Sequence, residues 1–94
     1  MVTVLNQLCK KTNEILMVSP NPANDYVTVG YKMKNVNEAK IRLIKTDNSI
    51  DRQYNVNLQS DQMSINVSDC PYGSYAIVLE CDGVNVDSRI IIIQ

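Results

Sequence analysis

The sequence contains no histidine among its 94 residues. Histidine is the commonest general base and metal ligand in proteins, and it activates the nucleophile in Ser-His and Cys-His pairs. No close pair of carboxylates replaces it, no glycine-rich loop indicates a nucleotide site, and the scattered aspartates form no Asp-x-Asp-x-Asp-Gly calcium loop. The sequence therefore predicts a protein that is not an enzyme and that has no cofactor or metal site.

The sequence also lacks a charge excess and long apolar runs. Nine basic and ten acidic residues give a formal net charge of -1. Nucleic acids and anionic membrane surfaces call for a basic patch, so neither is an expected partner. No apolar run approaches the roughly 20 residues of a membrane span, which predicts that there is no integral membrane segment. Residues 1–10 do not resemble a signal peptide. The protein is therefore expected to be cytoplasmic or a fragment of a larger exported chain.

The sequence has few cysteines, and they form no recognisable pair motif. The three cysteines are Cys9, Cys70 and Cys81, and an odd count leaves at least one thiol free. None belongs to a Cys-x-x-Cys pair. Cys70 and Cys81 lie in or beside apolar runs, which is typical of small core residues. A Cys70–Cys81 disulfide is the alternative.

Period-two alternation of apolar and polar residues runs through most of the chain. This alternation predicts strands with one buried and one wet face, as in antiparallel sheets. The expected strands cover residues 15–18, 27–33, 39–43, 54–59, 63–67, 75–81 and 84–93. At Ile90–Ile93 both phases are apolar, so this stretch is expected to be covered on both faces. No convincing helical period occurs, although residues 1–12 are ambiguous.

Turn residues separate these strands. Asp82-Gly83 fits a tight type I′ hairpin, Asn48 tolerates the left-handed conformation, and Pro71-Tyr72-Gly73 ends a connection. Short strands with turns every 8–12 residues or so predict an all-β fold, an immunoglobulin-like antiparallel β-sandwich of about seven strands. The expected domain covers residues 14–94, and residues 1–13 are expected to be a linker or the end of an upstream segment.

A proline-rich corner follows the first expected strand. Pro20 and Pro22 cannot donate to a strand ladder, so they are expected to end the strand and stiffen the link to the next one. Asn21 and Asn24 are expected to bond their side chains to the local backbone. The segment is thus predicted to be a rigid corner, which needs no further function.

The same corner begins a resemblance to a known family that covers about residues 15–94. VSPNPANDYVTV, Val18–Val29, resembles the Pro-Asn-Pro segment that opens the type A C-terminal sorting domain of the type IX secretion system. Ala39–Ile50 is similar to the family's central strand and turn. Ile65–Val84 is similar to its segment with a proline–glycine corner and Gly-x-Tyr, and Ser88–Gln94 to its closing strand.

The chain departs from the family's usual pattern at three places. Asn48 stands where the central turn usually carries glycine, and it is a tolerable substitute for a left-handed residue. Cys70 stands where a leucine commonly precedes the corner. Arg89 is the only basic residue of the final strand, which usually carries more lysine. The third departure concerns the export signal more than the fold.

The resemblance implies a sorting signal, because in this family the domain is the last part of a cargo protein. The cargo crosses the inner membrane by its own signal peptide, and the outer-membrane translocon then recognises the folded domain. A surface peptidase commonly removes the domain and joins the cargo to a lipopolysaccharide anchor. The implied partners are the type IX translocon, its surface peptidase and a fused N-terminal cargo domain. The implied localisation is the periplasm in transit, then the cell surface or the medium, with cleavage around residues 1–13 or upstream.

An immunoglobulin-like accessory or adhesion module that binds carbohydrate or protein is the alternative. For a sorting domain, recognition through strand addition to an exposed sheet edge is expected. The residues that we expect to contribute are Pro20, Asn21, Pro22, Gly73, Tyr75, Arg89, Ile90 and Ile92. For the isoleucines and the prolines the alternative is a purely architectural role. Gly73 is expected to serve its turn, and Tyr75 to pack inward with its hydroxyl bonded to the backbone, much like a tyrosine corner.

Overall fold

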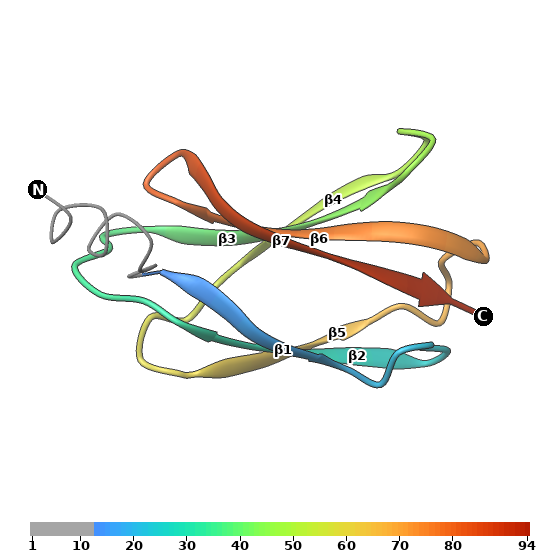
Figure 1. The fold of residues 1–94 in the computed structure, drawn as a ribbon, viewed down its shortest axis with the longest axis horizontal. Helices are drawn as coiled ribbons and strands as arrows, with labels where there is room; N and C mark the ends of the chain where they lie inside the picture. Colours follow the sequence, from blue (N-terminus) through green and yellow to red (C-terminus); the bar gives the residue numbers. More distant parts are fainter. Residues whose placement is uncertain (1–12) are drawn as a thin grey trace, which may run out of the picture.

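Residues 13–94 are described in a computed structural model of the chain, and they contain seven strands (Figure 1). The strands are β1 (Glu14–Ser19), β2 (Tyr26–Lys32), β3 (Ala39–Lys45), β4 (Asp51–Asn55), β5 (Gln62–Asn66), β6 (Gly73–Cys81) and β7 (Val84–Ile93). Within this range there is no helix, and so none that is long and apolar enough to cross a membrane. The predictions for residues 1–12, Cys9 among them, lie outside the described residues.

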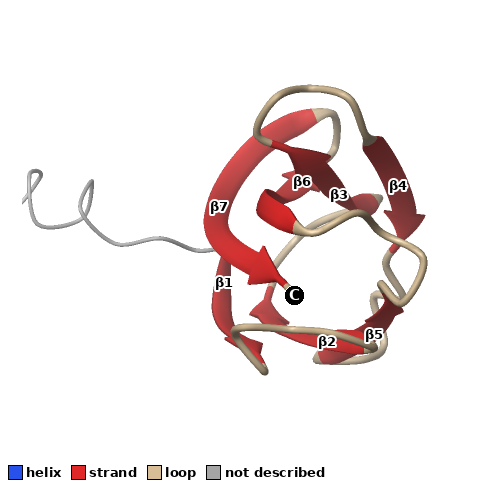
Figure 2. Ribbon diagram, turned by 90° about the vertical axis from the view of Figure 1, so that its right-hand side faces the viewer, coloured by secondary structure: helices blue, strands red, loops and turns tan. Residues whose placement is uncertain are grey.

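The strands form two antiparallel sheets that face each other. One sheet has the order β1-β2-β5 and the other the order β4-β3-β6-β7. Seen nearly end-on in Figure 2, the two sheets enclose a common interior, with β7 beside β1. The predicted all-β sandwich of about seven strands is confirmed, and the arrangement is consistent with an immunoglobulin-like fold.

Inward-facing side chains from both sheets build one core. On β6 every second residue is buried, from Tyr75 through Ile77 and Leu79 to Cys81. Each large aliphatic side chain that is fully buried contributes about 1.5–3 kcal/mol of transfer free energy. The core residues are Ile15, Ala23, Val27, Val29, Tyr31, Ala39, Ile41, Leu43, Val56, Ile65, Val67, Cys70, Tyr75, Ile77, Leu79, Cys81, Ile91 and Ile93. The alternation in the sequence therefore corresponds to the inner and outer faces of the sheets.

The turn predictions are confirmed at two places. Asp82 and Gly83 both have positive φ, 51° and 83°, as a type I′ hairpin requires. The Asp82 carboxylate also accepts the backbone N–H of Glu38 at 2.9 Å, which ties this hairpin to the loop before β3. Asn48 has a φ of 65°, so it adopts the left-handed conformation that was predicted for it.

The cysteine prediction is confirmed for the two cysteines that the structure describes. Cys70 and Cys81 are buried and free, so the alternative disulfide between them is not formed. Burial raises the pKa of both thiols, because an apolar environment disfavours the thiolate. Both cysteines therefore act as small core residues.

The strand predicted over residues 54–59 is wrong in its position. The strand β4 covers Asp51–Asn55, because it pairs with β3 directly after the tight turn. The following residues bend instead of extending, since the Asn57 side chain accepts the backbone N–H of Gln59 at 2.9 Å. Val56 is still buried, but Leu58 is 39% exposed. Apolar and polar residues thus go on alternating in the sequence after the strand itself has ended.

The prediction that Ile90–Ile93 is covered on both faces is also wrong. Ile91 and Ile93 are each 1% exposed, whereas Ile90 is 60% and Ile92 37% exposed. The reason is that β7 is the last strand of its sheet and only the inner face of that sheet packs on the other one. The outer face of β7 therefore presents apolar side chains to solvent.

Candidate recognition surface

The proline-rich corner lies between β1 and β2. Strand β1 ends at Ser19, immediately before Pro20, as the two prolines predict. The Ser19–Pro20 and Asn21–Pro22 peptide bonds are both cis. Pro20, Asn21 and Pro22 are exposed, whereas Ala23 is 1% exposed and belongs to the core. We call residues 20–23 the corner.

The Asn21 side chain does not bond the local backbone, contrary to the sequence prediction. Its Oδ1 accepts the backbone N–H of Ile92 at 3.0 Å, 71 residues further along the chain. The bond predicted from the Asn24 side chain to the local backbone is also not formed, and this side chain makes no hydrogen bond to any described residue. The physical reason is that the chain reversal between β1 and β2 places the corner beside the end of β7, where an unpaired N–H is available.

Two backbone hydrogen bonds join the corner to the same strand. The Ala23 N–H donates to the Ile92 carbonyl oxygen at 2.8 Å, and the Gln94 N–H donates to the Ala23 carbonyl oxygen at 2.8 Å. Ala23 and Ile93 thereby form a parallel bridge. The corner is thus paired with the outer edge of β7 over Ile92–Gln94.

Two further candidates, Gly73 and Tyr75, lie on β6, which pairs with the other edge of β7. Gly73 pairs with Ile93, and Tyr75 pairs with Ile91, where β6 begins. Gly73 is the first residue of β6, and its φ of 145° favours glycine where the connection enters the strand. The Tyr75 ring is fully buried and its hydroxyl donates to the Pro71 carbonyl oxygen at 2.6 Å. This bond, four residues back along the chain, confirms the predicted tyrosine-corner geometry.

Arg89 lies further back along β7 and contacts β1. Its Nη2 donates to the Ile15 carbonyl oxygen at 2.6 Å, and the Asp87 carboxylate accepts the Ile15 N–H at 2.9 Å. These two side chains of β7 therefore satisfy both backbone groups of one β1 residue, across the seam between the sheets. Seven of the eight predicted residues gather around the end of β7, and Arg89 closes the seam behind them.

Apolar side chains extend from this end of β7 across the outer face of the larger sheet, exposed at Ile90 and Ile92 and partly buried on β3 and β6. The register places Ile44, Ala76 and Ile90 in one cross-strand row over β3, β6 and β7. Val78 lies two residues further along β6, on the same face, and Ile92 lies two residues beyond Ile90. The sequence prediction missed Ile44, Ala76 and Val78 because the register that joins them is not visible in any local pattern.

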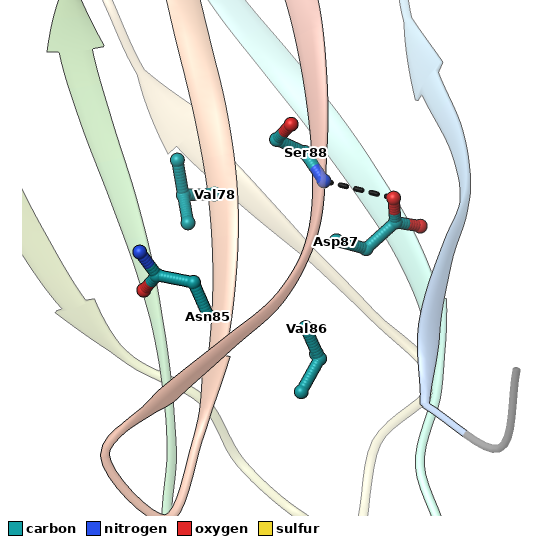
Figure 3. Close-up of a pocket in the computed structure, with 5 residues that line it drawn as sticks. All are labelled: Val78, Asn85, Val86, Asp87 and Ser88. Carbon is teal, nitrogen blue, oxygen red and sulfur yellow. Dashed lines mark hydrogen bonds between the residues drawn. The ribbon is translucent and has the colours of Figure 1, made fainter.

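A shallow hollow of about 370 Å³ lies near the β6–β7 hairpin (Figure 3). Its lining residues are Val78, Asn85, Val86, Asp87 and Ser88. The Asp87 carboxylate bonds the backbone N–H groups of Ser88 and Ile15, so it is part of the architecture. Residues 13–94 also contain no group of three or more side chains placed to hold a metal ion.

Comparison with known families identifies the domain. A family described as secretion system C-terminal sorting domain matches residues 17–94, which include the corner, β6 and all of β7. A comparison with curated proteins finds no match. Domains of this family are generally non-catalytic and direct export to the cell surface or the medium. The chain belongs to the family of type IX C-terminal sorting domains.

Proposed function

We propose that this domain directs a larger cargo protein, fused before it, through the outer-membrane translocon of the type IX system. The observation that carries the proposal is the contact between the corner and the end of β7. Asn21 and Ala23 bond Ile92 and Gln94, so two segments that mark the family resemblance form one surface in the folded domain. Such a surface gives a translocon a means of recognising the folded state.

The cargo would cross the inner membrane by its own signal peptide and reach the translocon from the periplasm. Residues 14–94 would form the sorting domain, and residues 1–13 the linker in which, or before which, a surface peptidase cleaves. The domain itself would do no chemistry, as is general for the sorting-domain family. The released cargo would then remain at the cell surface or enter the medium.

Exposed side chains on β7 are the physical basis that we propose for recognition. Ile90 and Ile92 present apolar surface, which isolated soluble domains rarely gather into patches without a partner. Pro20 and Pro22 are exposed beside them on the corner. A partner with an apolar groove would bury these groups together.

An export assay tests the proposal. Residues 1–94 are fused to the C-terminus of a reporter that carries an N-terminal signal peptide, in a bacterium with type IX secretion. Reporter at the surface and in the medium is compared with that of a translocon-deficient strain. We expect translocon-dependent export, and the mass of the exported reporter shows whether the domain is removed. A stable reporter held in the periplasm in both strains would contradict the proposal and favour an accessory or adhesion module.

A further inference from the structure

The outer edge of β7 is occupied where the strand ends. In an antiparallel ladder the backbone groups of every second residue point away from the paired strand. Ile92 belongs to this outward set, and its N–H bonds Asn21 while its carbonyl oxygen accepts from Ala23. The Gln94 N–H, next in the set, bonds Ala23. The last stretch of β7 therefore has hydrogen-bond partners on both sides.

We infer that the corner is a clasp that holds the end of β7 in the sheet, with Asn21 as its positioning residue. A partner then recognises this strand through its exposed side chains and not by adding a strand to its edge. This inference rests on the proposed function for the identity of the partner. It changes the expected mode of recognition, because an occupied edge offers few free backbone groups for strand addition.

Asn21 suits this role because its side-chain amide oxygen stands in for the carbonyl oxygen of a neighbouring strand. A neighbouring strand would offer Ile92 a carbonyl oxygen, and the Asn21 amide oxygen takes that place at 3.0 Å. The Ala23 backbone makes the next two bonds, and its side chain is buried in the core, which anchors the corner. With the Ile92 and Gln94 N–H groups and the Ile92 carbonyl oxygen thus bonded, the side chains of Ile90 and Ile92, 60% and 37% exposed, are apolar groups still open to a partner near the end of β7.

Amide hydrogen exchange tests the clasp without any partner. We expect protected amides at Ile92 and Gln94 in the wild-type domain. Asn21→Ala removes the acceptor and should speed exchange at Ile92 by about tenfold or more. Asn21→Asp keeps an acceptor oxygen and should restore most of the protection. Asn24→Ala is the matched control, because this exposed neighbour makes no side-chain hydrogen bond within the described residues. Equal exchange at Ile92 in all four proteins would overturn the clasp.

Export of the reporter fusion then tests how the partner uses the strand. If the partner recognises side chains on a strand that is held in place, Asn21→Ala should lower export at least severalfold, while Asn21→Asp and Asn24→Ala retain it. If the partner pairs with the edge of β7, releasing the clasp should leave export unchanged or raise it, and this result would overturn the inference. Thermal unfolding and periplasmic reporter levels identify any loss that arises from misfolding.

A second pair of variants separates side chain from backbone. Ile90→Ser and Val84→Ser remove apolar side chains that are equally exposed, 60% each, from the same strand. We expect Ile90→Ser to lower export with the Ile92 amide still protected, and Val84→Ser to leave export unchanged. Equal export by both variants would contradict recognition through Ile90. A wild-type reporter that is not exported would contradict the proposed function, whereas the exchange rates decide the clasp independently.

Discussion

The Tyr75 hydroxyl donates a 2.6 Å hydrogen bond to the carbonyl oxygen of Pro71. The ring lies fully buried at the start of β6, and the bond fixes the connection that enters this strand. The backbone of Tyr75 also pairs with Ile91, so the same residue helps to position β7. A single residue, through its side chain on one side and its backbone on the other, thus links the loop before β6 to the last strand.

Replacing Tyr75 with phenylalanine should keep the ring and remove the bond. We expect Tyr75→Phe to lower the free energy of unfolding by about 1–2 kcal/mol, since the hydroxyl bond is lost while the apolar burial stays. Urea unfolding measures the change. Tyr72→Phe is the control, because Tyr72 is 77% exposed and its loss should change stability by less than about 0.5 kcal/mol. Equal stability of the two variants would show that the bond contributes nothing.

A side chain at Gly73 should strain the backbone. Its φ of 145° lies where residues with a Cβ are rarely found, so Gly73→Ala should cost about 1–3 kcal/mol. The new Cβ would also lie 3.0 Å from Lys45 Nζ, a flexible group that can move away. Chemical denaturation measures the loss. Gly83→Asn is the comparison, since Gly83 has open space around it and asparagine tolerates a left-handed φ. A Gly73→Ala domain as stable as Gly83→Asn would refute the strain.

The thiols of Cys70 and Cys81 should be unreactive in the folded domain. Both are buried, and burial raises the pKa of each, so little thiolate is present at neutral pH. In a Cys9→Ser background, a thiol reagent should label neither cysteine under native conditions and both in denaturant. Mass spectrometry counts the labels. Rapid labelling of the native domain would contradict the burial of these side chains.

Acid should weaken the domain partly through Asp69. Arg52 binds both carboxylate oxygens, at 3.0 and 3.2 Å, and this lowers the pKa of Asp69 below its ordinary value of 3.8. A lowered folded-state pKa contributes stability above the unfolded pKa, and the contribution is lost as the pH falls through the folded value. The effect should be small because the carboxylate is exposed.

The matching variant is Asp69→Asn, which cannot ionise. Urea midpoints should show wild type above Asp69→Asn near pH 7, with the difference closing at about pH 3 or below. A difference that persists unchanged in acid would assign it to packing or neutral hydrogen bonding instead of charge.

Local pattern explains how much of the fold is predictable from this sequence. Alternation identified the inner faces of β2, β3 and β6 because the side-chain period of a strand is a property of neighbouring residues. Asp82-Gly83 and Asn48 were equally readable, since positive φ depends on the residue itself. The apolar–polar pattern gave the wrong end for β4, because the chain bends after Asn55 although the alternation goes on. It also gave the wrong burial for Ile90, because only one face of β7 is covered.

The candidate surface was predictable residue by residue but not as an assembly. Pro20–Pro22 and the closing strand were singled out separately, and their contact depends on a hydrogen bond between residues 21 and 92. Nothing local to Asn21 specifies that partner, because a side-chain acceptor is equally compatible with its own turn. The outer apolar row was missed for the same reason, since register across three strands sets it.

The side-by-side course of β1 and β7 has a mechanical consequence. Both strands run in the same direction, so β1 starts at one end of the long axis and the chain finishes at the other (Figure 1). A pull between Glu14 and Gln94 acts along both strands and across the bonds of the corner and of Arg89. Those bonds would be loaded together in shear instead of opening one after another, so the seam would bear tension as a unit.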